Sequence, residues 1–130
     1  MTMRKYWLVL LAASGFCSPA QAMDESTKTA LLRLDPVTRL EQRCDIEVMD
    51  RIKQSGQYNP DRVVAYATRE PKIEGDEIKT RGAAFRSRGN WYGLEFKCQT
   101  EPDHLTVRSI RYKIGAPIPE EKWQKYYLFR

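Results

Sequence analysis

Apolar residues recur with a helical period between residues 35 and 54. Those spaced by three or four positions are Val37, Leu40, Cys44, Val48 and Ile52. This spacing places them on one face of an α-helix, with Cys44 in the middle of that face and Ile46 on the opposite side. Asp35 can cap the first free amides, and Pro36 at the first helical position loses no useful donor. The pattern therefore predicts a helix from Asp35 to about Gln54.

Beyond residue 60 the pattern changes to the alternation that is typical of strands. The predicted strands cover residues 62–67, 77–86, 91–100 and 105–114. The third is the clearest, because apolar and polar residues alternate from Tyr92 to Cys98. A change of phase between Val107 and Ile110 indicates a bulge. We read residues 68–76 as a loop and residues 119–127 as a short helix.

These elements predict an α+β fold, in which the long helix lies across a four-stranded antiparallel meander sheet. The order of elements is similar to that of cystatin-like folds, by analogy only. Cys44 on the helix and Cys98 on the third strand would both face the core. Small residues at 82–84 would let the helix backbone approach the sheet closely.

The N-terminus has the features of a secretory signal peptide. Arg4 and Lys5 precede an uncharged apolar run, and small residues at Ala20 and Ala22 match a cleavage site. We expect cleavage after Ala22 and a periplasmic or secreted protein. Lipidation at Cys17 is the alternative. The chain then divides into a signal peptide (1–22), a lead-in segment (23–34) and one α+β domain (35–130), with no transmembrane segment.

Export leaves two cysteines, which predicts a disulfide between Cys44 and Cys98 in an oxidising compartment. Export also lowers the net charge. The chain has 22 basic and 17 acidic residues. Removing Arg4 and Lys5 leaves 20 basic residues and a net charge of +3. Such a surface is typical of mixed, solvated charge, with attraction to anionic envelope material as the alternative, and nucleic acid is not an expected partner.

The chain also resembles a family of small secreted bacterial proteins known as domain of unknown function number 930. The matching stretches are residues 34–36, 39–46, 82–87, 91–92, 96–98, 118–119 and Trp123. The resemblance covers nearly all of the chain after Ala22. It implies the compartment and the extent of the domain, and it implies no chemistry.

Few residues could carry catalysis. His104 is the only histidine, and we expect it to be a solvated turn residue without a metal. Neither Ser87 nor Ser109 has the surroundings of a serine nucleophile. Glu41 and Asp45 lie one helical turn apart at the edge of the apolar face. They could do acid–base chemistry, or they could orient the helix through an ion pair with Arg86 or Arg111.

The turn between the second and third strands mixes arginines with aromatic residues, a candidate binding surface formed by Arg86, Arg88, Trp91 and Tyr92. This interpretation expects Trp91 to be exposed, and the alternative is that Trp91 covers the second face of the sheet. Near the C-terminus, Trp123, Tyr126 and Tyr127 would share one side of a helix. That side would either pack on the core or form an exposed patch.

The sequence favours a non-enzymatic binding or interaction module of the cell envelope, with another envelope protein or a glycan as its partner. No cofactor and no metal are expected. One alternative is a small hydrolase that uses Glu41 and Asp45. The other is a structural envelope subunit that self-associates through its terminal aromatic residues.

Overall fold

The computed structural model describes residues 23–130, so the expected signal peptide, its cleavage site and Cys17 lie outside the described residues. The helices are α1 (Glu25–Leu32) and α2 (Pro36–Gln54), followed at the C-terminus by the 3-10 turns η1 (Glu120–Lys122) and η2 (Gln124–Tyr126). The strands are β1 (Pro60–Val64), β2 (Lys72–Glu74), β3 (Glu77–Ser87), β4 (Asn90–Thr100) and β5 (Val107–Pro117).

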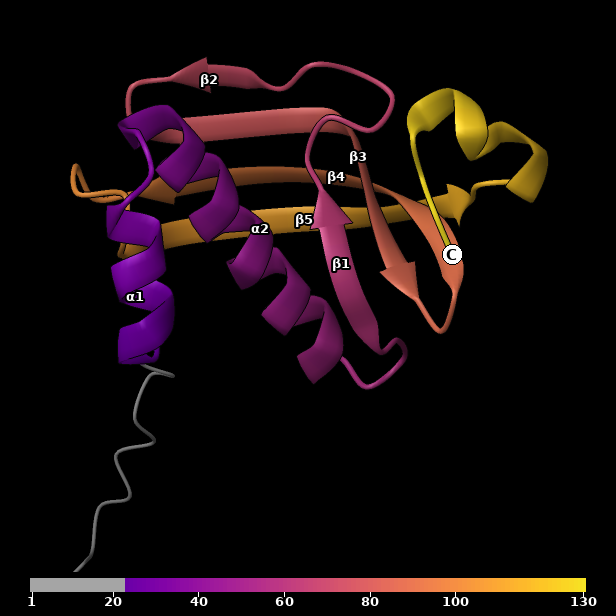
Figure 1. Cartoon of the computed structure of the whole chain (residues 1–130), viewed down its shortest axis with the longest axis horizontal. Coiled ribbons are helices and arrows are strands. Elements are labelled where there is room, and N and C mark those ends of the chain that lie inside the picture. Colours follow the sequence, from indigo (N-terminus) through magenta and orange to yellow (C-terminus); the bar gives the residue numbers. More distant parts are fainter. Residues whose placement is uncertain (1–22) are drawn as a thin grey trace, which may run out of the picture.

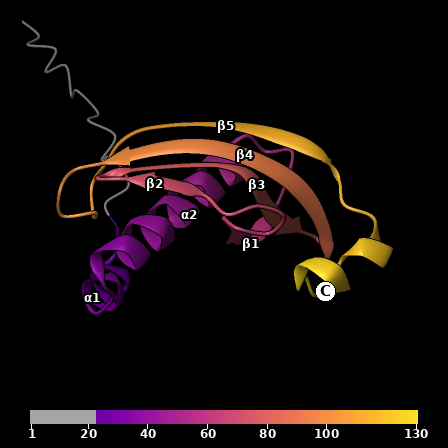
Figure 2. The same ribbon diagram turned by 90° about the horizontal axis from the view of Figure 1, so that it is seen from above.

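The five strands form one antiparallel sheet, which confirms the α+β class (Figure 1). The strand order is β1-β3-β4-β5, and β2 pairs with the start of β3. The predicted count of four strands is wrong, because residues 72–74 form a short strand where we expected only loop. Three residues are too few to show alternation. Figure 2 shows α1 and α2 on one side of the curved sheet, while neither α-helix lies on its other side.

Helix α2 begins and covers the sheet largely as its sequence predicts. The Asp35 carboxylate accepts hydrogen bonds from the backbone amide and the hydroxyl of Thr38, at 3.1 and 2.6 Å. Its apolar face is fully buried from Leu40 onward, but Val37 is exposed. The first turn is held by polar contacts, including Arg39 Nε to the Leu31 carbonyl at 3.0 Å. On the far side of α2, Ile46 lines a hollow beside α1.

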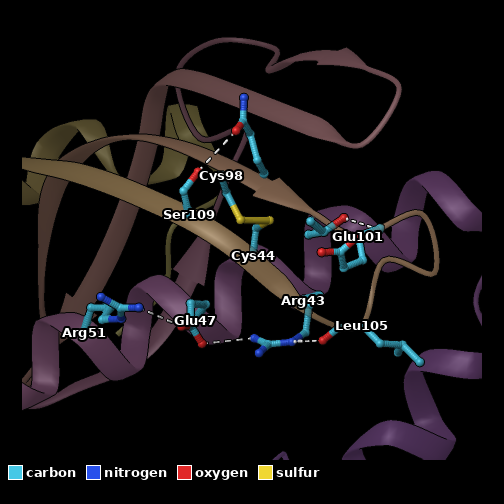
Figure 3. Close-up of a disulfide and its surroundings, with 10 residues drawn as sticks. Arg43, Cys44, Glu47, Arg51, Cys98, Glu101, Leu105 and Ser109 are labelled. Carbon is cyan, nitrogen blue, oxygen red and sulfur yellow. Dashed lines mark hydrogen bonds and ion pairs between the residues drawn. A yellow bond between two sulfur atoms is a disulfide. The ribbon is translucent and has the colours of Figure 1, made fainter. Parts of the chain in front are cut away.

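A disulfide between Cys44 of α2 and Cys98 of β4 crosses the main core (Figure 3). The two Cα atoms are 6.1 Å apart and both residues are fully buried. Next to it, Arg43 Nε donates to the Leu105 carbonyl at 2.7 Å, and Glu47 lies between Arg43 and Arg51. One covalent link and a chain of polar contacts therefore fix α2 against the sheet and the loop before β5.

Two local irregularities shape the strands. In β5, Val107 lies opposite Thr100 and Ser109 lies opposite Gln99, so Arg108 is the extra residue of the predicted bulge. In β3, a side chain at Gly82 would come within 2.5 Å of the Arg69 backbone nitrogen. Gly82 therefore admits the loop after β1 and not α2, whereas Ala83 packs in the main core together with the buried face of α2.

The C-terminal segment is not the continuous helix that we predicted. It forms two 3-10 turns and then a left-handed residue, Tyr127, with φ of 54°. The Leu128 amide donates to the Trp123 carbonyl at 2.9 Å, which turns the chain back toward the sheet. Trp123 and Leu128 can then pack together with Ala84 and Trp91 as a second apolar cluster.

Candidate functional site

The turn between β3 and β4 sends its two aromatic residues to opposite sides of the sheet. Trp91 is 2% exposed and belongs to the second apolar cluster, whereas Tyr92 stacks on Phe85 in the main core. The interpretation in which Trp91 is exposed is therefore wrong, and the alternative, in which Trp91 covers the second face of the sheet, is confirmed. The C-terminal residues cover it, and the Trp91 indole donates to the Phe129 carbonyl at 2.9 Å.

Arg86, like Trp91, holds the C-terminal residues against the hairpin. Its guanidinium pairs with Asp61 at 2.8 Å and donates to the Phe129 carbonyl at 3.2 Å. It also lies 5.7 Å from the centre of the Trp91 ring. The hydrogen bond from Arg86 lowers the pKa of Asp61, and the same contact raises the pKa of Arg86.

The C-terminal residues place two aromatic rings in solvent beside this hairpin. Tyr127 is 82% exposed and Phe129 is 67% exposed, while Leu128 between them is buried. Arg130 stacks over Trp123, pairs with Glu120 and lies next to Gly89 of the β3–β4 turn.

We call Arg88, Tyr127, Phe129 and Arg130 the hairpin–tail surface. Arg88 and Gly89 both have positive φ, as a tight two-residue hairpin turn requires. The sequence analysis missed Phe129 and Arg130. No local sequence signal marks them, because residues 127–129 are all apolar and the fold alone decides which of them are exposed.

Glu41 and Asp45 lie on α2 without the expected cation. Asp45 is only 7% exposed, and its Oδ1 has no hydrogen-bond partner among the described residues. Burial raises the pKa of Asp45 well above its usual range, and the Glu41 charge adds to the shift. Burial and the charge of Glu70 also raise the pKa of Glu41.

The predicted ion pair with Arg86 is wrong, because Arg86 pairs with Asp61. Arg111 makes no ion pair within residues 23–130 and lies on the face of the sheet away from α2. A protonated Asp45 could in principle donate a proton. Asp45 is buried, however, so a substrate cannot reach its carboxyl group. Its position is that of a structural residue.

His104 is not a solvated turn residue, because both of its ring nitrogens are bonded in a buried position. Nδ1 donates to the Pro36 carbonyl at 2.6 Å, and Nε2 lies 2.9 Å from Asp76 Oδ1. The ring therefore joins the start of α2 to the turn before β3. Within the described part of the chain, no group of three or more acidic, histidine or cysteine side chains could hold a metal ion.

The two serines also have structural contacts. Ser87 Oγ accepts a hydrogen bond from the Asn59 amide at 2.9 Å, and Ser109 Oγ donates to Gln99 at 3.2 Å. Neither hydroxyl bonds to His104, which would be the base of a serine nucleophile.

Comparison with known proteins identifies a family but no characterised relative. No curated protein and no solved structure matches the chain. From residue 23 onward, none of the helices combines the length and the apolar character needed to cross a membrane. The family model for Domain of Unknown Function (DUF930) matches residues 31–128, from the end of α1 to the second apolar cluster. The chain therefore belongs to the family described as Domain of Unknown Function (DUF930).

Proposed function

We propose that the protein is exported and acts in the cell envelope as a small non-enzymatic module that binds wall glycan through the hairpin–tail surface. The observation that carries this proposal is the exposure of Tyr127 and Phe129 on a backbone that is held in place. Export after Ala22 remains part of the proposal, and the buried disulfide is compatible with an oxidising compartment.

The support beneath the two rings is what distinguishes them from a frayed end. Leu128 is anchored in the second apolar cluster, and the Phe129 carbonyl accepts hydrogen bonds from both Trp91 and Arg86. An aromatic ring whose backbone is already ordered loses little conformational entropy on binding. The arrangement therefore favours recognition of a ligand over simple exposure of a flexible terminus.

The neighbouring charges suit a glycan. Aromatic faces are electron-rich and pack against the C–H bonds of sugar rings. Arg88 and Arg130 add guanidinium donors that can bond to hydroxyl or carboxylate oxygens. Of the four residues expected to bind from the sequence, Arg88 stays in the proposed surface. Arg86 and Trp91 support it from below, and Tyr92 belongs to the core.

Sedimentation with insoluble wall glycan tests this proposal. The intact, disulfide-bonded protein should sediment with purified wall glycan, and a Tyr127→Ala, Phe129→Ala double variant should stay in solution. Tyr66→Ala is the matched control, because Tyr66 is another exposed aromatic residue and lies on the loop after β1. Wild-type protein that stays in solution, or a double variant that still sediments, would contradict the proposal.

An envelope protein as the partner is the other outcome of this test. In that case, affinity capture from envelope extract would retain a protein with wild type and lose it with the double variant, while glycan would not be bound.

The hydrolase that uses Glu41 and Asp45 has one supporting observation, the raised pKa of both groups. The burial of Asp45 argues against it.

A further inference from the structure

Figure 2 shows the side of the sheet that α2 leaves uncovered, and the register of the strands places a row of cations across four strands on that side. The register pairs Lys72 of β2 with Lys79 of β3. It also pairs Lys79 with Lys97 of β4, and Lys97 with Arg111 of β5. Residues that are directly paired in a sheet point to the same side. We call Lys72, Lys79, Lys97 and Arg111 the cation row.

The surroundings of the row add more positive charge than negative charge. Arg81 and Lys113 line the same shallow hollow as three members of the row, so five cations and one carboxylate, Glu95, surround it. Glu95 is paired in register with Lys113 but forms no ion pair with it. Among residues 23–130, the side chains of Arg81 and Lys113 have neither an ion pair nor a hydrogen bond.

Half of the row itself is neutralised within the fold. Lys72 has a carboxylate on its own strand at 3.3 Å, and Lys97 lies 3.6 Å from Glu77. Within the part of the chain that the structure describes, Lys79 and Arg111 have no such partner. Like charges that face each other across strands destabilise a sheet. The row therefore opposes folding stability, and such local conflicts are expected at functional sites.

Protection of the sheet edges explains only the ends of the row. Lysines on edge strands prevent one sheet from pairing with another, which is a sufficient reason for a cation on β2 or β5. Lys79 and Lys97 lie on β3 and β4, which have neighbours on both sides in this part of the sheet. The two central cations need a different explanation.

We propose that the cation row binds a linear acidic polysaccharide that lies across the strands. Neighbouring strands are about 4.8 Å apart, so the row presents one cation at each step of about this length. That spacing is close to the length of one sugar unit along a glycan chain, so a polyuronate that lies across the strands keeps its carboxylates within reach of the cations. The hairpin–tail surface plays no part in this inference, which rests on different residues and on charge.

Other anionic partners fit this face less well. Proteins that bind single-stranded nucleic acid combine cations with aromatic rings on which bases stack. Tyr112 is the one large exposed aromatic residue of the described chain that lines this hollow, and its hydroxyl turns to the α2 side of the sheet, where it donates to the Arg51 carbonyl at 3.5 Å. Stable binding to a membrane surface generally needs an inserted apolar group as well as charge. The cation row offers charge alone.

Binding of the intact, disulfide-bonded protein to polygalacturonate tests the inference, with neutral dextran as the comparison polymer. The test variant is Lys79→Gln, Arg111→Gln, which removes the two unpaired members of the row. The matched control is Lys28→Gln, Lys53→Gln, which removes two exposed charges from the helices. The control and the test variant therefore have the same net charge. Isothermal titration calorimetry at low and high salt measures affinity, and thermal unfolding checks the fold.

We expect wild type to bind polygalacturonate but not dextran, with an affinity that falls as salt is added. The test variant should bind about tenfold more weakly, and the control variant should bind as wild type does. The test variant should melt no earlier than wild type, because it loses like-charge repulsion. No binding by wild type, or equal loss in both variants, would overturn the inference. So would tighter binding to single-stranded DNA or to phosphatidylglycerol vesicles than to polygalacturonate.

Discussion

At the scale of single residues, this fold places two polar groups differently from expectation, since Asp45 was expected to have a cationic partner at the edge of the α2 face and His104 was expected to be solvated. Asp45 is buried without a partner for one oxygen, and His104 is buried with partners for both nitrogens. Both differ from the sequence-based expectation for the same reason. Their burial depends on segments distant in the chain, and helical or strand periodicity does not report on such contacts.

The Asp45 carboxyl should make stability depend on pH. Its pKa is raised in the folded protein, so the folded state holds this proton more tightly than the unfolded state. Between the ordinary Asp pKa of about 3.9 and the raised value, stability falls as pH rises, and above the raised value the loss is complete. Asp45→Asn mimics the protonated form. It should stabilise the protein by about 1 kcal/mol or more at pH 7.5 and by much less at pH 3.5.

Urea unfolding at the two pH values measures this difference. Glu121→Gln serves as the control, because Glu121 is an exposed carboxylate near the C-terminus. An Asp45→Asn variant that is less stable than wild type at pH 7.5 would show that the charged form has a partner that stabilises it.

At the scale of elements, the sequence predicts α2 and β4 well because their periods are long and regular. The α2 face from Leu40 to Ile52 and the alternation from Leu94 to Cys98 both persist in the structure. The bulge in β5 is also confirmed. The periodicity of apolar residues does not predict β2, because that strand has only three residues. It does not predict the C-terminal turns either, because their shape depends on contact with Trp91.

The candidate site was harder to predict than the fold. Arg86, Arg88, Trp91 and Tyr92 are neighbours in sequence, yet only Arg88 belongs to the hairpin–tail surface. Strand alternation separates Trp91 from Tyr92, and the return of residues 127–130 to the hairpin then buries Trp91. No local pattern indicates which segment will cover a strand. For the same reason, the cation row becomes visible only when the register is known.

The C-terminal residues should contribute to stability as well as to binding. Leu128 is buried against Trp91 and Trp123, so Leu128→Ala should lower the free energy of unfolding by about 2–3 kcal/mol. The same change should move tryptophan emission to longer wavelength, because it opens the cluster to water. Leu32→Ala removes an exposed leucine from α1 and should change neither property. An unaltered emission spectrum for Leu128→Ala would indicate that the tail does not cover Trp91.

At the scale of the whole molecule, one covalent link joins the helical layer to the sheet. Cys44 and Cys98 are 54 positions apart in the sequence. A link that closes a loop of this length contributes about 4 kcal/mol in the chain-entropy model. The typical stability of a domain is about 5–15 kcal/mol, so this contribution is large.

Breaking the link should therefore weaken the entire fold rather than one segment. The Cys44→Ala, Cys98→Ala double variant should lose about 4 kcal/mol of unfolding free energy. Chemical denaturation followed by far-UV circular dichroism measures this loss. A loss below about 1 kcal/mol would mean that noncovalent packing alone fixes α2 on the sheet.

Intact mass spectrometry of the exported protein would also show whether its chain begins at Met23, as we propose.

The central claim is that the hairpin–tail surface binds wall glycan, and amide chemical shifts test it most directly. Soluble fragments of wall glycan would be titrated into the isotope-labelled, disulfide-bonded protein. We predict that the amides whose chemical shifts change cluster at Arg88, Gly89 and residues 127–130. The same amides should respond when the titration is repeated with added salt. Shifts that gather on α2 around Glu41 and Asp45, or a spectrum that does not change, would contradict the claim.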